Sequence, residues 1–122
     1  MLNARQALGK FGEDAATAYL ERLGYGIVAR GWRCRTGEVD IVARRGEQLV
    51  FVEVRARRGT ATTPEESITA KKQARLVRLA YAYLDAHAIS PESNWRIDVM
   101  AVVVSAAGRI TRLTHIESAI EL

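Results

Sequence analysis

Residues 37–55, GEVDIVARRGEQLVFVEVR, decide the fold. Two β-prone runs flank a turn signal in which Gly46-Glu47 is the natural two-residue loop, because such loops favour glycine at their first central position. This loop sets a register in which the numbers of opposed residues add up to 93. We therefore predict an antiparallel hairpin in which Asp40 lies directly opposite Glu53.

The opposed acids indicate a cation site. Side chains alternate along a strand, so Glu38 shares a face with Asp40, and Arg55 shares a face with Glu53. Two carboxylates that face each other repel, and burying them is costly unless a cation lies between them. Two alternatives remain open at this point. A loop longer by one residue, with a bulge, moves Asp40 opposite Val52, and a half-exposed hairpin carries these acids as ordinary surface residues.

Composition limits the class of protein. A chain of 122 residues that is 48% apolar is long enough to bury a core as one domain. The single cysteine, Cys34, excludes an internal disulfide framework and a cysteine-rich zinc cluster. The sequence has neither an apolar signal core at its start nor a stretch long enough to span a bilayer, so we expect a cytoplasmic protein without membrane contact. Its net charge of +4 suits a polyanionic partner, although modest excess charge is also common for solubility alone.

The remaining patterns predict two helices and three further strands around the hairpin. The predicted order is αβββαββ in one α/β domain that spans residues 1–122, with a core of about residues 7–115 and a mixed sheet flanked by helices. Gly24 closes the first helix, and Thr63 caps the second with Pro64 in its first position. The predicted helices are residues 7–23 and 64–87, the strands are 25–32, 38–44, 48–57, 95–105 and 109–114, and residues 116–122 form a final short helix.

Several charged residues on the predicted helices fit more than one role. Glu13 lies at the margin of the apolar stripe of the first helix, where it either needs a partner or is a surface acid near a helix start. Lys72 lies within the apolar arc of the second helix, where snorkelling to solvent is the ordinary explanation. Lys71, Arg75 and Arg78 form a basic stripe beside it, and a solvated helix face is the default for such a stripe.

The order of elements and four short motifs together resemble the YraN family, a group of small bacterial proteins. The motifs are Gly12-Glu13, Gly37-Glu38-Val39-Asp40-Ile41-Val42-Ala43, Val50-Phe51-Val52-Glu53-Val54-Arg55 and Arg96-Ile97-Asp98-Val99. The likeness runs from about Gly9 to Val104. That family is in turn similar to the PD-(D/E)XK nucleases, especially the Holliday-junction-resolvase branch, which implies a restriction-endonuclease-like core.

The resemblance implies a catalytic site made of Glu13, Asp40, Glu53 and Arg55. Asp40 and Glu53 match the two motif acids, Arg55 occupies the position of the motif lysine, and Glu13 matches the acid on the first helix. The implied ligands of Mg²⁺ or Mn²⁺ are Asp40, Glu53 and Glu13, with the backbone carbonyl of Val54 as a further ligand. Hard oxygen donors of this kind suit those ions.

The implied substrate is DNA, with branched DNA favoured because no base-reading module is visible in the sequence. The residues expected to bind nucleic acid are Arg33, Arg35, Arg57, Lys71, Lys72 and Arg75. Resolvase-like relatives act as dimers, so a homodimer is a further expectation. The implied function is a structure-selective endonuclease that acts in recombination or repair.

Two departures from the nuclease pattern bear on activity. Val39 replaces the proline that precedes the first acid, a change that such nucleases tolerate. Arg55 replaces the lysine, and an arginine cannot act as a general base because it does not lose its proton in a protein. The metal then activates the water, or Lys72 enters the site, or the site is impaired. The alternative function is therefore a non-catalytic nucleic-acid-binding module, and a third possibility is a protein-interaction adaptor without affinity for nucleic acid.

The sequence also predicts the roles of four other polar residues. Glu38 is a candidate for an additional ligand. Asp98 matches a family position, and we expect it to be a hydrogen-bonded strand residue near a sheet edge. His87 and His115 lack the spacing of zinc ligands and are expected to be structural or surface residues.

Overall fold

The predicted hairpin is present, in the predicted register. In the computed structural model, which describes residues 1–59 and 68–122, β2 (Gly37–Arg45) and β3 (Gln48–Arg58) pair antiparallel through the turn at Gly46-Glu47. Gly46 has a φ of +59°, which a glycine adopts without steric cost. The ladder runs from Arg45 opposite Gln48 to Ile41 opposite Val52, and it ends one residue before the two acids.

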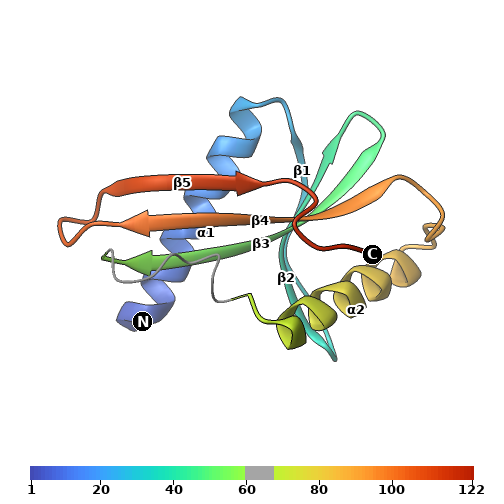
Figure 1. Cartoon of the computed structure of the whole chain (residues 1–122), viewed down its shortest axis with the longest axis horizontal. Coiled ribbons are helices and arrows are strands. Elements are labelled where there is room, and N and C mark those ends of the chain that lie inside the picture. Colours follow the sequence, from blue (N-terminus) through green and yellow to red (C-terminus); the bar gives the residue numbers. More distant parts are fainter. Residues whose placement is uncertain (60–67) are drawn as a thin grey trace.

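The hairpin lies within a five-stranded mixed sheet of order β1-β2-β3-β4-β5 (Figure 1). Strands β3 and β4 (Trp95–Val104) are parallel, whereas β1 (Gly26–Cys34) with β2 and β4 with β5 (Ile110–Ile116) are antiparallel. The parallel pair needs a crossover connection, and that connection contains α2 (Ala70–Ala86). The observed order αβββαββ confirms the predicted α/β class and is consistent with a restriction-endonuclease-like core.

The two helices cover opposite faces of the sheet. On one face α1 (Ala4–Arg22) packs Ala16 and Leu20 in one cluster with strand residues that include Val50 and Val52. On the other face α2 packs Leu79 in a second cluster that includes Phe51. The alternation of side chains along β3 thus supplies both clusters. In neither helix of the described ranges is the apolar stretch long enough to cross a membrane.

The first helix begins three residues earlier than predicted. Asn3 caps α1 by accepting a hydrogen bond from the Gln6 backbone N–H at 2.8 Å, and the Gln6 side chain accepts one from the Asn3 N–H at 3.1 Å. This capping box satisfies two backbone donors of the first turn. The apolar periodicity starts only after it, and for this reason the prediction began at residue 7. The helix ends as predicted, with Gly24 following it at a φ of +91°.

The second helix begins later than predicted. Ile68 and Thr69 are not helical, and the Thr69 hydroxyl caps α2 by accepting from the Lys72 N–H at 3.2 Å. The predicted cap at Thr63 and first turn at Pro64 lie outside the described residues. Threonine is a favoured N-cap residue, but the sequence analysis did not consider Thr69 for this role.

The predicted C-terminal helix was wrong. Strand β5 continues to Ile116, and the described residues after it form turns and irregular chain. The Ser118 N–H donates to the Asp98 carboxylate at 2.9 Å, and the Ala119 N–H donates to the Ile97 carbonyl at 3.0 Å. The tail is therefore fastened to β4, because its backbone donors bond to that strand instead of to helical carbonyls.

Gly12 sets how closely α1 approaches β3, and an alanine there should destabilise the protein. A Cβ at Gly12 would lie 2.7 Å from the Ala56 Cβ, which is attached directly to the β3 backbone and cannot swing away. Overpacking of this kind costs about 1–3 kcal/mol, which equals or exceeds the roughly 1 kcal/mol that alanine gains in a helix. We expect Gly12→Ala to lower the free energy of unfolding, measured by urea titration, by up to about 2 kcal/mol.

Gly9 provides the matched control on the same helix. A Cβ at Gly9 meets no atom within 4 Å, so only the gain in helix propensity remains. Gly9→Ala should raise the free energy of unfolding by about 0.5–1 kcal/mol. Equal effects of the two substitutions would contradict the close contact between α1 and β3.

Candidate functional site

In strands β1 and β2 the regular alternation of side chains between the two faces of the sheet is interrupted at Gly31 and Asp40. Arg30 pairs with Ile41 and Trp32 pairs with Val39, so Gly31 and Asp40, which lie between these pairs, are opposite each other. Residues two apart on a strand ordinarily share a face, but Val39 packs in the α2 cluster and Ile41 packs in the α1 cluster. Gly31 has a φ of +63°, a left-handed conformation that other residues rarely adopt.

This irregularity places Asp40 where β2 separates from β3. The backbone N–H of Val54 donates to Oδ2 of Asp40 at 2.8 Å, in place of the next ladder bond. The Asp40 and Glu53 carboxyls share a hydrogen bond, and Glu53 is buried with 9% of its surface exposed. The predicted register thus holds up to the acids, and the carboxyl groups meet at the point of separation.

The shared environment changes the protonation of Asp40. The pKa of Asp40 is raised to about 8, first by burial and next by the charge of Glu53, while the Val54 N–H acts in the opposite direction. Glu13 adds a smaller increase from α1. The pair therefore retains a proton near neutral pH, because two buried carboxylates close together do not both ionise easily. A cation placed between them would remove that penalty.

Glu13 lies beside Asp40 but has a partner of its own. Both residues line a cavity of about 670 Å³ beside α1. Oε1 of Glu13 accepts from Nε of Arg30 at 3.1 Å, and Arg30 also donates to Asp14 at 2.7 Å. Hydrogen bonds from Arg30 and Lys10 lower the pKa of Asp14. Glu13, at the margin of the apolar stripe of α1, therefore has Arg30 of β1 as its partner.

Arg55 contacts the second acid directly. Its Nη1 lies 3.5 Å from Oε2 of Glu53, and the two side chains are only 15% and 10% exposed. A guanidinium keeps its charge even at such depth, so it places a fixed positive charge beside the carboxylate pair. Arg55 offsets part of the repulsion between Asp40 and Glu53, but as a charge and hydrogen-bond donor only.

Glu38 lines the same cavity as Glu13 and Asp40 and pairs with Arg33 at 3.2 Å. Within residues 1–59 and 68–122, no three acidic, histidine or cysteine side chains are grouped so that they could hold a metal ion. The predicted triad of acids is thus divided: Asp40 and Glu53 are together, whereas Glu13 is held by Arg30. Metal binding by these residues stays a prediction.

The residues predicted to bind nucleic acid fall in separate regions. Arg33 and Arg35 are exposed at the end of β1, and the guanidinium of Arg75 lies near Gly37, 3.9 Å from where a Cβ would be. Lys71 is exposed in the first turn of α2. Lys72 is half-buried, and among the described residues its ammonium group pairs with neither site acid. Arg57 lies at the far end of β3.

Sequence reasoning did not find the most highly connected polar group, which surrounds Asp98. This residue is fully buried and accepts from Nε of Arg96 at 2.9 Å, and its Oδ2 lies 2.7 Å from Nε2 of His115. Arg96 continues to the Tyr25 hydroxyl at 2.7 Å. Asp98 is hydrogen-bonded as expected, and its strand β4 lies between β3 and the edge strand β5.

The two histidines have structural surroundings. The ring of His87 stacks on Tyr83 with centroids 3.9 Å apart, and His115 joins the buried group around Asp98. A signal for this group was present in the sequence, because Arg96 and Asp98 are two apart on one strand and share a face. Their partners Tyr25 and His115 come from distant segments, which spacing alone does not reveal.

Comparison with known proteins gives the family. Residues 12–102 match the model of "Uncharacterised protein family UPF0102", the YraN family. The chain belongs to this family. UPF0102 proteins of Chloroflexus aurantiacus and Roseiflexus castenholzii are 52% and 48% identical to it over 120 and 122 residues, with at least 98% of each chain covered. A UPF0102 protein of Geobacter sulfurreducens is 46% identical over 116 residues, covering 94% of this chain and 89% of its own.

Proposed function

We propose that this UPF0102 protein is a metal-dependent, structure-selective endonuclease that hydrolyses phosphodiester bonds of DNA. The observation that carries the proposal is the meeting of Asp40 and Glu53 where β2 separates from β3, with the pKa of Asp40 raised to about 8 by burial and by its neighbour. Perturbed acids in a cleft are typical of functional sites. The restriction-endonuclease-like order of elements supports the same class of reaction.

The donor set suits Mg²⁺ or Mn²⁺. These ions are commonly held by one or two carboxylates, with waters and substrate phosphate completing the coordination. Asp40 and Glu53 would supply the carboxylates, and Glu13 would join them by leaving Arg30. When bound, such an ion supplies positive charge to a phosphate oxygen and lowers the pKa of a coordinated water.

The surrounding side chains would hold the DNA. Arg55 would donate to the reacting phosphate, because its guanidinium already lies at the carboxylate pair. The cations around the β1–β2 turn and on α2 would contact phosphates without reading bases, which fits selection by DNA shape. In this proposal those cations are Arg33, Arg35, Lys71, Lys72 and Arg75, with Arg57 at the end of β3.

Removing the carboxylate pair should abolish cleavage. Purified protein is incubated with four-way-branched, flapped and linear DNA in Mg²⁺ or Mn²⁺, with a chelator in parallel. We expect cleavage of branched substrates that falls at least about 100-fold in Asp40→Asn and in Glu53→Gln, because loss even of groups that support a metal ligand costs 10–100-fold. The readout is the initial rate of product formation on denaturing gels.

Glu47→Gln is the matched control, because it removes an exposed acid from the turn of the same hairpin. Its cleavage rate should equal that of the unaltered protein. Cleavage that persists in an Asp40→Asn, Glu53→Gln double variant would show that another site or a contaminating nuclease is responsible, and the proposal would be withdrawn.

A second candidate function is a non-catalytic nucleic-acid-binding module. The observation that favours it is Arg55, which pairs with Glu53 at 3.5 Å in the position of the nuclease lysine and cannot act as a base. DNA binding without cleavage in the unaltered protein, together with cleavage gained in Arg55→Lys, would support this function. Robust cleavage by the unaltered protein would exclude it.

A further inference from the structure

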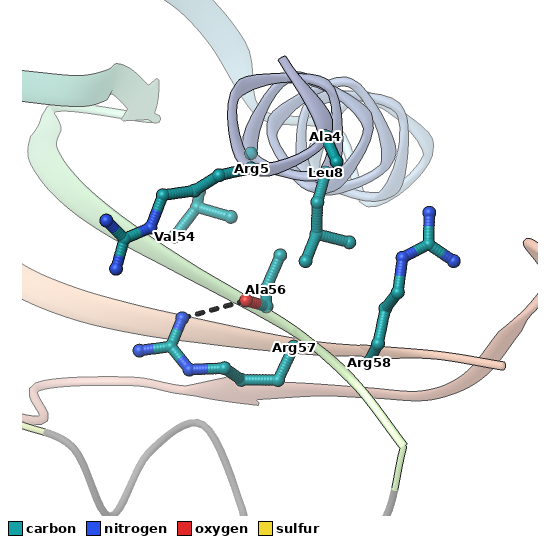
Figure 2. A pocket seen from close by; sticks show the side chains of 8 residues that line it. Ala4, Arg5, Leu8, Val54, Ala56, Arg57 and Arg58 are labelled. Atoms are coloured by element: carbon teal, nitrogen blue, oxygen red, sulfur yellow. Dashed lines mark hydrogen bonds between the residues drawn. The ribbon is translucent and has the colours of Figure 1, made fainter. Parts of the chain in front are cut away.

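A second pocket lies between the first turns of α1 and the end of β3 (Figure 2). Its volume is about 480 Å³, and Leu8, Val54 and Ala56 form an apolar floor. Arg5 enters it from α1, and Arg57 and Arg58 enter it from β3. Figure 2 shows Arg5 and Arg57 extending to the same side of β3 and Arg58 extending to the other side.

Among residues 1–59 and 68–122, the three guanidinium groups have no acidic partner. Nη1 of Arg57 donates to the Ala56 carbonyl at 2.8 Å, and Nη1 of Arg58 donates to the Ser105 carbonyl at 3.3 Å. These bonds orient the side chains but leave their charge uncompensated. In the described part of the chain no carboxylate forms an ion pair with Arg5, Arg57 or Arg58. Burial, together with the charges of Arg55 and Arg5, lowers the pKa of Arg57. Cations crowded in this way favour an anionic ligand.

The pocket adjoins the cavity that Glu13 and Asp40 line. Gly9 and Val54 line both this pocket and the cavity that contains Glu13 and Asp40. Glu53 and Arg57 are four residues apart on β3, a distance of about 13 Å at roughly 3.3 Å per residue. That distance is too long for both ends to contact one phosphate group. It suits two phosphates of one strand.

We propose that the pocket of Arg5, Arg57 and Arg58 binds a backbone phosphate of a nucleic-acid strand whose reacting phosphate lies at Asp40 and Glu53. This inference rests on the proposed function for the reacting phosphate, and it adds the direction of the strand, along β3 beside α1. Guanidinium groups bind phosphate oxygens with paired hydrogen bonds, and the apolar floor accepts the sugar. Arg55 lies between the two ends of this path, where it is paired with Glu53.

The test is DNA binding in the presence of a chelator, so that cleavage does not contribute. Fluorescence anisotropy of single-stranded and branched oligonucleotides is measured over a range of salt concentrations. For the Arg5→Gln, Arg57→Gln double variant we expect affinity to fall about tenfold or more, and the salt dependence of log K to become shallower by about 1.4 on single strands. Arg5→Gln alone, an exposed position that does not affect folding, should show about half the change in slope.

An Arg22→Gln, Arg44→Gln double variant is the matched control, because it removes two exposed arginines outside the pocket and gives the same net charge. If this control loses as much affinity as the Arg5, Arg57 variant, only overall charge matters and the inference is overturned. It is also overturned if the unaltered protein does not bind DNA.

The inference and the proposed nuclease activity fail separately. Binding that depends on Arg5 and Arg57 in a protein that never cleaves would retain the phosphate pocket and refute the nuclease. If these substitutions change neither cleavage nor binding, the nuclease is retained and the phosphate pocket is refuted. Strands with a 5′-phosphate and a 5′-hydroxyl are compared as well. Equal dependence on Arg5 and Arg57 identifies an internal phosphate and supports the proposal, whereas dependence only with the 5′-phosphate identifies a terminal phosphate and overturns it.

Discussion

Raising the pH from about 5 to about 9 in a chelator should lower the stability of the protein, and Asp40→Asn should remove most of this loss. The pKa of Asp40 is raised from 3.8 to about 8 by burial and by Glu53. Between these values the folded protein keeps a proton that the unfolded chain has released, so the stabilising effect is complete below pH 4 and is lost as pH rises toward 8. The loss per pH unit is at most about 1.4 kcal/mol.

Asparagine is the informative substitution because it resembles a protonated aspartic acid. Its amide oxygen accepts the Val54 N–H, its amide N–H donates to Glu53, and it carries no charge at any pH. The variant should therefore match the unaltered protein below pH 4, and its advantage should grow as the pH rises, to a few kcal/mol near pH 9. The measurement is the free energy of unfolding by urea titration at each pH.

Divalent cations supply a second arm of this experiment. If Asp40 and Glu53 hold Mn²⁺ or Mg²⁺, the ion should stabilise the unaltered protein more at pH 9 than at pH 5, and should not stabilise Asp40→Asn to the same degree. Asp14→Asn is the control, because hydrogen bonds from Arg30 and Lys10 lower the pKa of that exposed acid. Parallel pH curves for the unaltered protein and Asp40→Asn would contradict the raised pKa and remove the main support for the metal site.

The hairpin at the centre of the site was predictable because its determinants are local. A two-residue turn with glycine in its first position and the alternation of apolar residues set the register between Ile41 and Arg45. Extended by one pair beyond Ile41 and Val52, this register brought Asp40 to Glu53. A short turn leaves two strands little freedom in how they pair, so the spacing of residues in the sequence determines which residues lie opposite each other.

The features that sequence reasoning missed depend on contacts between distant segments. No sequence pattern states that Gly31 adopts a left-handed conformation, yet this conformation turns Asp40 out of the ordinary alternation. Likewise Arg30 reaches Glu13 only because β1 passes beside α1. Arg5 of the pocket was missed for a different reason. The capping-box pattern of Asn3 and Gln6 was visible in the sequence. A helix that began there would have placed Arg5 on the same face as Gly12, which is seven residues further on.

Asp98→Ala should be among the most destabilising single substitutions in the chain, with a loss of about 3–5 kcal/mol. Asp98 is completely buried and receives hydrogen bonds from Arg96, His115 and the Ser118 N–H. Burial alone would raise its pKa, but these partners outweigh burial and the pKa of Asp98 lies below its usual value. Removing the carboxylate leaves the half-buried guanidinium of Arg96 without its main counterion and releases the C-terminal tail.

Glu117→Gln separates this buried role from ordinary surface charge. Glu117 also pairs with Arg96, at 3.1 Å, but 55% of its side chain is exposed. Exposed pairs contribute about 0–1 kcal/mol, so this variant should unfold at nearly the same urea concentration as the unaltered protein. Because Asp98 lies beside Val52 in the parallel β3–β4 register, a loosened β4 should also disturb Glu53 next to it. A loss below about 1 kcal/mol in Asp98→Ala would mean that this acid does not hold β4, β5 and the tail together, and its place in the family motif would then need a functional explanation.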